Sequence, residues 1–337
     1  MPSRDIIVMG ASAGGIESLR SVLGNLPKDL PAAVLIVLHI SPDHRSVLPR
    51  ILDAAGPLPA AHAADGERLE HGRVYVAPPN RHLVVDDGVV RLTRSPREGG
   101  HRPAVDPLFR TAARFHGARV IGVVLSGALD DGTAGLLAVK QRGGVAVVQD
   151  PDDALCGDMP RSALENVDVD YCLPVSAIPD LLEKLLREPV ELHSPIPPLL
   201  LRETDIALER NPSDENAPGK PSEFACPSCG GVLNEVHDGK VLRFRCRVGH
   251  AYGVASLTAD QQDKMEAALW AALRALEDQI ALNRRLARRA EERGHRYTAE
   301  TFRRYEESAL EQANTIRGAL NKTTNGVPES VPARDPA

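Results

Sequence analysis

The 337-residue chain contains 42% hydrophobic and 26% charged residues, so it can bury a core large enough for two domains. Its formal net charge of −6 gives no overall cationic field for nucleic acid, and 3% aromatic residues are too few for a base-stacking platform. No apolar run approaches the ~20 residues of a membrane-spanning helix, and the N-terminus lacks the basic and apolar regions of a secretory signal. The sequence therefore predicts a cytoplasmic protein without membrane insertion.

In the first half of the chain, short runs of β-branched residues alternate with amphipathic stretches. Continuous apolar runs are typical of parallel strands that are buried on both faces. The expected strands are Ile6–Met9, Val34–His39, Val120–Leu125 and Val145–Gln149, and the expected helices are Gly15–Leu23 and Gly132–Arg142. An Asp-Gly turn at 87–88 predicts a hairpin, an antiparallel addition to the sheet. The pattern predicts a doubly wound, mostly parallel, Rossmann-like α/β sheet.

Composition divides the chain into five parts. We expect a catalytic domain over 1–187, a Pro-rich linker over 188–222 with one short helix at 199–209, and a cysteine-containing hairpin over 223–256. A helical hairpin over 257–322 and a disordered tail over 323–337 follow. Within the helical part, one apolar stripe runs from Met265 to Ile280, and a second, which includes Tyr305, runs from Phe302 to Leu320. These stripes predict two amphipathic helices that fold back on each other or on a partner.

A turn of small residues, 10–15, connects the first expected strand to the first expected helix and contains Ser12. Such a sharp turn needs small side chains, exposes the serine hydroxyl and directs backbone N–H groups at a developing oxyanion. A phosphate-binding Rossmann turn is the competing interpretation. The full G-x-G-x-x-G spacing is absent, however, and the second strand ends in His39 instead of an acidic residue.

Two more polar residues follow predicted strand ends, His39 after the second strand and Asp131 after the third. Catalytic groups of open α/β sheets gather at the carboxyl ends of the strands. Taken singly, His39 could cap its strand and Asp131 could cap the next helix. Together with Ser12 they predict a triad in which the carboxylate orients the imidazole. The order Ser-His-Asp differs from that of the common α/β-hydrolases.

Residues 5–187 resemble the catalytic domain of chemotaxis-type protein-glutamate methylesterases. The matching segments are 10–15, 37–39, 74–82, 102–109, 125–132 and 157–161. The resemblance implies that Ser12 is the nucleophile, His39 the general base and Asp131 the orienting carboxylate. It also implies that the backbone N–H groups of Ala13 and Ala128 form the oxyanion hole.

The reaction implied by the resemblance is two-step hydrolysis of a glutamyl methyl ester through an acyl-enzyme, without a cofactor. Members of the family also deamidate glutamine. Arg102 and Asp106 are expected at the rim of the site, with a structural ion pair or loop anchor as the alternative. Family members usually carry a receiver domain ahead of the catalytic one. Here the match begins at residue 5, which leaves regulation and the receptor substrate open.

Cys226-Pro227-Ser228-Cys229 and Cys246-Arg247-Val248-Gly249-His250 enclose a second predicted hairpin. Two ligands from each turn, Cys226, Cys229, Cys246 and His250, can close a tetrahedral structural zinc site. A redox Cys-x-x-Cys pair is the alternative, but it leaves Cys246 and His250 unexplained. An odd count of five cysteines favours reduced thiols over a disulfide framework.

The sequence as a whole predicts a protein-glutamate methylesterase that acts on a methyl-accepting receptor or a similar helical protein. One alternative is an esterase with another substrate. Another is a non-catalytic scaffold assembled through the zinc and helical modules. The C-terminal helices could also join two copies of the chain, and no nucleic-acid partner is favoured.

Overall fold

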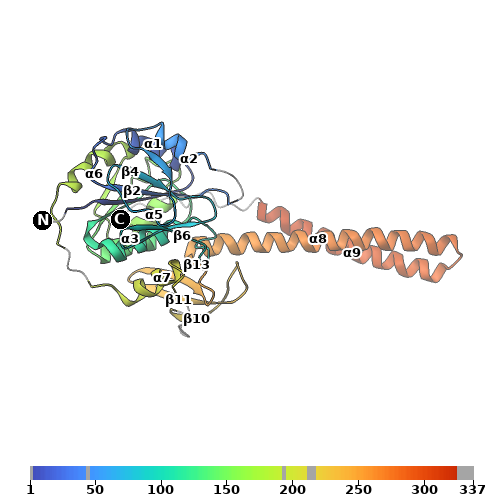
Figure 1. The fold of residues 1–337 in the computed structure, drawn as a ribbon. Coiled ribbons are helices and arrows are strands. Elements are labelled where there is room, and N and C mark those ends of the chain that lie inside the picture. Colours follow the sequence, from blue (N-terminus) through green and yellow to red (C-terminus); the bar gives the residue numbers. More distant parts are fainter. Residues whose placement is uncertain (1–2, 43–45, 192–194, 211–217, 325–337) are drawn as a thin grey trace, which may run out of the picture. The chain divides into compact units, whose positions relative to one another are not determined.

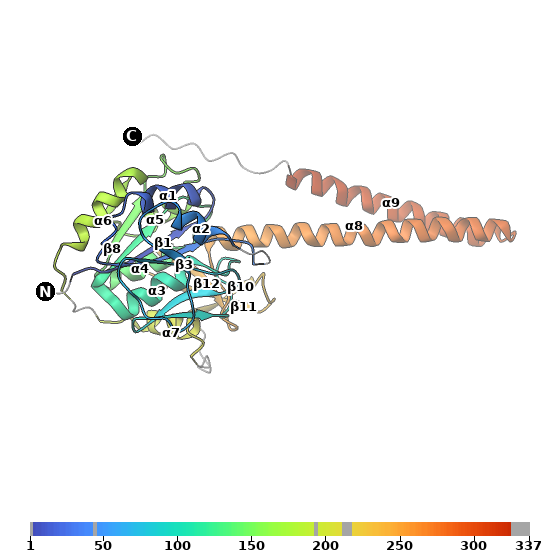
Figure 2. The ribbon, with the colours of Figure 1, turned by 45° about the horizontal axis from the view of Figure 1, so that its top comes forward.

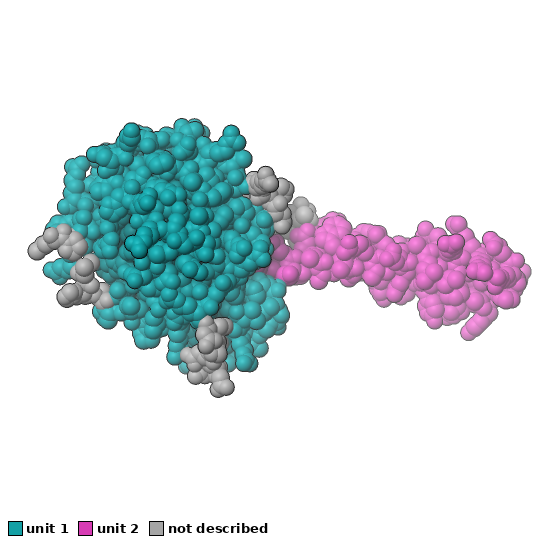
Figure 3. Space-filling model, in the orientation of Figure 1, with its two compact units in different colours: residues 1–258 teal, residues 259–337 magenta. Residues whose placement is uncertain are grey.

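The computed structural model of the protein describes residues 3–42, 46–191, 195–210 and 218–324. Its contacts divide the chain into two compact units, residues 1–258 and 259–337 (Figure 3). In the described ranges, no helix is both long and apolar enough to cross a membrane. The predicted disordered tail, 323–337, lies outside the described residues from residue 325 onward, so its disorder stays a prediction, as does the five-part division.

A seven-stranded sheet with the order β3-β4-β2-β1-β7-β8-β9 forms the centre of the first unit (Figure 1). Every neighbouring pair in it is parallel, which confirms the predicted sheet. The predicted strands are β1 (Ile6–Ala11), β2 (Ala33–Leu38), β7 (Val120–Val124) and β8 (Val145–Gln149), and all their residues are buried. We did not predict β3 (Ala60–His62), β4 (Arg73–Val76) and β9 (Tyr171–Leu173), because three or four residues are too few to show a pattern.

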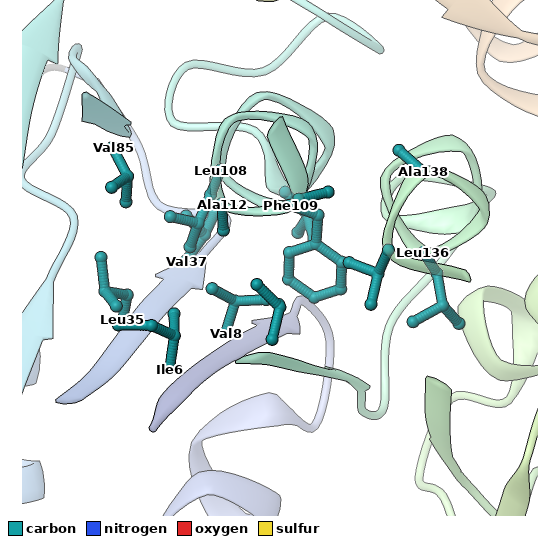
Figure 4. Packing of buried hydrophobic residues seen from close by; sticks show 14 of the residues in the cluster. Ile6, Val8, Leu35, Val37, Val85, Leu108, Phe109, Ala112, Leu136 and Ala138 are labelled. Atoms are coloured by element: carbon teal, nitrogen blue, oxygen red, sulfur yellow. The ribbon is translucent and has the colours of Figure 1, made fainter. Parts of the chain in front are cut away.

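Helices cover both faces of this sheet (Figures 1 and 2). One face packs against α1 (Gly15–Gly24), α2 (Leu48–Asp53) and α6 (Ile178–Leu186), and the other against α3 (Val105–His116), α4 (Thr133–Gln141) and α5 (Asp158–Asn166). Side chains alternate along a strand, so Ile6 and Val8 of β1 enter one core while Ile7 and Met9 enter the other. Figure 4 shows Val8 beside Phe109 of α3, with Leu136 of α4 on the other side of the Phe109 ring.

The predicted Asp-Gly hairpin is present as β5 (His82–Asp86) and β6 (Val89–Thr93). It forms a separate two-stranded sheet, so the prediction that it extends the central sheet was wrong. The reason lies in its packing on α3, where the Val85 N–H donates to the hydroxyl of Thr111 at 3.1 Å. Held there, β5 and β6 cover the core instead of continuing the sheet edge.

The short helix expected within the Pro-rich segment is α7 (Pro198–Ala207), and it packs on α3. Arg114 of α3 donates to Thr204 Oγ1 at 2.7 Å and to Asp205 Oδ1 at 2.6 Å. After α7 comes an antiparallel sheet of β10 (Lys220–Ala225), β11 (Val232–Asp238), β12 (Val241–Cys246) and β13 (Ala251–Gly253). We call residues 220–253 the cysteine hairpin; it belongs to the same compact unit as the parallel sheet.

Five buried charged side chains join the cysteine hairpin to α3 and α7: Glu98, Arg110, Glu203, Arg243 and Arg245. Arg243 pairs with both carboxylate oxygens of Glu203, at 2.7 and 3.1 Å. Arg245 donates to Glu203 at 3.1 Å and to Glu98 at 3.0 Å, and Glu98 also pairs with Arg110. Burial alone would raise the pKa of Glu203, but the three guanidinium groups lower it well below its usual range. The Glu203 carboxylate therefore stays ionised although it is buried.

Replacing Glu203 by Gln should lower the free energy of unfolding by roughly 3–5 kcal/mol, because buried guanidinium groups lose a shared counter-charge. Chemical denaturation measures the change. The matched control is Glu183→Gln, whose partner Arg187 is 78% exposed, and we expect a change below about 0.5 kcal/mol there. Equal stability of the Glu203 variant and the parent would contradict the assigned role.

The second unit is dominated by two helices, α8 (Val254–Glu292), which starts in the first unit, and α9 (Arg296–Thr324). Their apolar core contains residues from both predicted stripes: Leu273, Ile280, Ala309, Ala313 and Leu320. Tyr305, which we assigned to the second stripe, is 57% exposed. Residues 309, 313, 316 and 320 of α9 are spaced by four, three and four positions. Continued towards the N-terminus, this spacing places Glu306, and not Tyr305, on the face of α9 that packs on α8. In agreement, Glu306 accepts a hydrogen bond from Arg284 of α8.

Candidate functional site

Ser12 lies in the three-residue turn between β1 and α1, at the carboxyl edge of the sheet. Its backbone N–H donates to the carbonyl of Ser126, in the loop that follows β7, at 2.9 Å. Gly14 has a φ of 74°, a left-handed conformation that favours glycine, and a Cβ there would meet Ser126 Oγ at 2.7 Å. The small residues of the turn therefore let two strand ends approach closely.

The structure brings together the three residues that the sequence predicts for a triad. Nδ1 of His39 lies 3.2 Å from Ser12 Oγ, and its Nε2 lies 2.7 Å from Oδ2 of Asp131. The backbone N–H of His39 donates to the carbonyl of Ala11 at 3.2 Å, which fixes the start of its side chain. If Nε2 carries the proton that it donates to Asp131, Nδ1 is free to accept the serine proton.

The carboxylate of Asp131 is surrounded by donors. It accepts from the backbone N–H groups of Val105 at 2.7 Å, Asp106 at 3.0 Å and Gly132 at 2.9 Å. Burial raises the pKa of Asp131, but the hydrogen bond and charge of His39, together with the backbone donors, lower it to about 2. Asp131 is therefore ionised and fixed in orientation, as a group that supports an imidazolium must be.

The neighbouring Asp130 has a different set of partners. Its carboxylate accepts from the backbone N–H groups of Ala255 at 2.8 Å and Ser256 at 3.4 Å, in the first turn of α8. Burial raises the pKa of Asp130. Of the two consecutive aspartates, Asp131 is the one that contacts His39.

His101 also contacts His39, and the sequence analysis did not single it out. The two imidazole rings are stacked, with centroids 3.8 Å apart and planes 12° apart. Burial lowers the pKa of His101 to about 4, and the neighbouring imidazole of His39 acts in the same direction whenever it is protonated, so His101 is neutral at pH 7. In the sequence, His101 could have been considered as a site residue because it directly precedes the matching segment 102–109.

Within the described parts of the chain, the backbone N–H groups of Ala13 and Ala128 donate to no protein acceptor. Gly127, just before Ala128, approaches Ser12 so closely that a Cβ there would lie 2.9 Å from the serine Cβ. Leu129 has a φ of 66°, an unusual backbone conformation of the kind that concentrates at functional sites. The loop after β7 thus lies directly against Ser12, and an oxyanion hole formed by the N–H groups of Ala13 and Ala128 stays a prediction.

Arg102 and Asp106 both have structural partners. Arg102 donates to Asn80 Oδ1 at 2.8 Å and to the carbonyl of Arg94 at 3.0 Å, which anchors two loops. Asp106 accepts from the backbone N–H of Gly135 at 2.6 Å, and burial and the nearby charge of Asp131 raise its pKa to about 7. These contacts are those of loop anchors, and a role at the rim of the site remains a prediction.

Four potential metal ligands converge in the cysteine hairpin, namely Cys226, Cys229, Cys246 and His250. Their ligand atoms all lie within 4.8 Å of one another. Cys229 Sγ lies 3.7 Å from Cys246 Sγ, which lies 3.5 Å from Nδ1 of His250. In a tetrahedral site with Zn–S bonds of ~2.3 Å, two sulfurs are ~3.8 Å apart, so the donors fit a zinc ion.

Residues 7–182 match the CheB methylesterase family. The chain is similar to the protein-glutamate methylesterase/protein-glutamine glutaminase 2 of Anaeromyxobacter dehalogenans, with 41% identity over 54% of this chain and 54% of the relative. A Pyrococcus horikoshii protein-glutamate methylesterase/protein-glutamine glutaminase is 35% identical over 55% of this chain and 51% of its own. The chain thus spans about half the length of these curated relatives.

A solved structure of the same family is also similar to this chain. The crystal structure of the Thermotoga maritima CheB methylesterase catalytic domain matches 55% of this chain and 100% of its own, with 37% identity and a TM-score of 0.52. A hydrogen-bonded Ser-His-Asp set at the carboxyl edge of a doubly wound parallel sheet defines a class of α/β proteins. Within this class, the chain belongs to the CheB methylesterase family.

His82 is a second buried histidine near this site. Its Nε2 contacts the carbonyl of Pro96 at 3.2 Å, and its Nδ1 accepts from the Ala104 N–H at 3.2 Å, so it holds both ends of the segment that contains His101. Burial lowers its pKa to about 4. Between pH 6.5 and 4, the unfolded chain therefore binds a proton at His82 that the folded chain does not.

The stability that His82 contributes is full above pH 6.5 and is lost as the pH falls towards 4. In His82→Gln, we expect the free energy of unfolding to depend less steeply on pH in this window, by up to ~1.4 kcal/mol per pH unit. Denaturation curves across the window measure this slope. The exposed His237 supplies the control, because His237→Gln should leave the slope unchanged. An unchanged slope in the His82 variant would refute the assignment.

Proposed function

We propose that the chain hydrolyses methyl esters of glutamate side chains in chemoreceptor-like proteins and, through the same intermediate, deamidates glutamine. The observation that carries this proposal is the continuous hydrogen-bonded path from Ser12 through His39 to the ionised Asp131. The similarity to protein-glutamate methylesterases/protein-glutamine glutaminases supports the choice of substrate.

The proposed reaction begins when Ser12 Oγ attacks the γ-carbonyl of the ester and its proton passes to Nδ1 of His39. Asp131 stabilises the resulting imidazolium, while the N–H groups of Ala13 and Ala128 donate to the oxyanion. The ester C–O bond breaks, and methanol leaves with the proton from His39. Water then attacks the acyl-enzyme, again losing a proton to His39, and releases glutamate and Ser12.

The two alternative functions, an esterase with another substrate and a non-catalytic scaffold, differ in whether they require the triad. An esterase with another substrate would keep the triad, whereas a scaffold assembled through the cysteine hairpin and α8–α9 has no need for an aligned nucleophile and base. The geometry of Ser12 and His39 therefore favours an enzyme. The proposed partner is a methyl-accepting receptor or similar helical protein, met in the cytoplasm, and α8–α9 could also join two copies of the chain.

Replacing Ser12 by Ala should lower methanol release from a methylated receptor by roughly 10⁴–10⁶-fold, because the nucleophile is lost. Methanol is measured by gas chromatography with equal amounts of folded protein. Ser176→Ala, at an exposed position, is the matched control and should retain the parent rate. Release that survives in the Ser12 variant would disprove the serine mechanism. No release by the parent, with hydrolysis of a small ester, would support the first alternative.

The same proposal includes a structural zinc ion bound by the four ligands of the cysteine hairpin. The donor distances support zinc, and four protein ligands leave no open position for a reacting water. The metal would therefore stabilise the hairpin and take no part in the chemistry.

The purified chain should contain one zinc ion, and Cys229→Ser should contain much less, because one of four ligands is lost. Elemental analysis measures the zinc content. The control is Cys172→Ser, an exposed cysteine of β9 outside the cluster, which should keep the metal. A parent protein without zinc, or a Cys229 variant that retains it fully, would count against the site.

A further inference from the structure

The cysteine hairpin is joined to the triad by a short series of contacts that begins at two of the proposed zinc ligands. Cys246 and His250 enclose a tight turn in which the Cys246 N–H donates to the His250 carbonyl at 3.0 Å. Ala251, the next residue, accepts from the Gly99 N–H at 2.8 Å and donates to the Arg97 carbonyl at 3.3 Å. The turn that carries the ligands thus pairs directly with residues 97–99 of the first half of the chain.

A buried side chain reinforces this pairing. Arg245 precedes the ligand Cys246, and its guanidinium group donates to the Gly249 carbonyl at 2.8 Å and to Glu98 Oε1 at 3.0 Å. Arg245 is 1% exposed and Glu98 5% exposed. The position of Glu98 therefore depends on the turn between Cys246 and His250 through both backbone and side-chain contacts.

Residues 98–101 carry the connection to the triad. The Glu98 N–H donates to the His101 carbonyl at 3.2 Å, and the His101 N–H donates back to the Glu98 carbonyl at 2.9 Å. Two consecutive glycines, Gly99 and Gly100, form the turn between them with φ values of 55° and 77°. Because glycine turns are adaptable, the location of His101 depends on the partners of Glu98 as well as on His82, which holds the two ends of the segment.

We propose that zinc in the cysteine hairpin controls the turnover of the esterase, because the metal-bound turn holds residues 97–101 and keeps His101 stacked on His39. His101 is then a positioning residue. Its flat ring limits the rotation of the imidazole that must face Ser12 on one side and Asp131 on the other. The effect on turnover rests on the proposed esterase activity, whereas the metal-dependent order of residues 97–101 rests only on the proposed zinc ion.

The first test is a double-mutant cycle in the full chain, with Cys229→Ser to release zinc and His101→Ala to remove the stacked ring. Each variant should lower kcat about tenfold with little change in KM, and the double variant should lose about tenfold rather than a hundredfold. His101→Phe should recover most of kcat, since a phenyl ring can also stack on His39. Cys172→Ser should match the parent. Multiplying effects, or an unchanged kcat in Cys229→Ser, would overturn the proposal.

The second test uses hydrogen exchange with and without zinc, and it needs no substrate. The amides of Gly99, His101 and Ala251 should exchange at least tenfold faster in the zinc-free protein, while those of β1 and β7 should not change. The β1 and β7 amides also report whether the parallel sheet remains folded after zinc is lost. If the parent lacks esterase activity, this exchange pattern still supports the coupling, and equal exchange at 97–101 in both states would disprove it.

Discussion

The arrangement of the site depends on one buried carboxylate. Asp131 accepts hydrogen bonds from three backbone N–H groups and from His39, and these donors keep it ionised although it is buried. Two of these donors, Val105 and Asp106, belong to the first turn of α3, where the partial positive charge of the helix also favours an anion. The first turn of α3 thus binds the carboxylate of Asp131, which lies in the loop after β7. The carboxylate held in this way orients the imidazole of His39.

A second group of buried charged side chains also holds α3 in place. Glu98 and Glu203 hold three arginines from α3 and β12, so α3 is fixed at its start by Asp131 and along its length by the cysteine hairpin. Buried ion pairs add little net stability compared with apolar packing, but they tolerate few alternative arrangements. In this protein they specify how the hairpin contacts the domain that carries Ser12.

Much of the fold and the three main site residues could be predicted from the sequence for physical reasons. Strands buried on both faces must be continuously apolar, and β1, β2, β7 and β8 are. The carboxyl ends of parallel strands share one edge, which places Ser12, His39 and Asp131 together once the strands are known. The ligand spacing of the cysteine hairpin is equally local and could be recognised without coordinates.

The remaining features depend on contacts between distant parts of the chain. His101 lies in a glycine-containing loop with no periodic pattern, and its position follows from Glu98 and Arg245, which are 147 residues apart. The β5–β6 hairpin was recognisable from its turn, but its packing on α3 was not. The error at Tyr305 is of another kind, because it is a shift of one residue along α9. The position that faces α8 is that of Glu306, whereas Tyr305 is exposed.

The position of β1 in the middle of the sheet has a consequence for synthesis of the protein. β1 is made well before β7, yet the two strands pair, with Val120 opposite Ile6. A ribosome must therefore add more than a hundred residues after β1 before the strand that leads into Ser12 has both of its neighbours. Until then the nascent chain holds Ser12 without Asp131, so the hydrogen-bonded set of Ser12, His39 and Asp131 can form only after the loop that follows β7 has emerged.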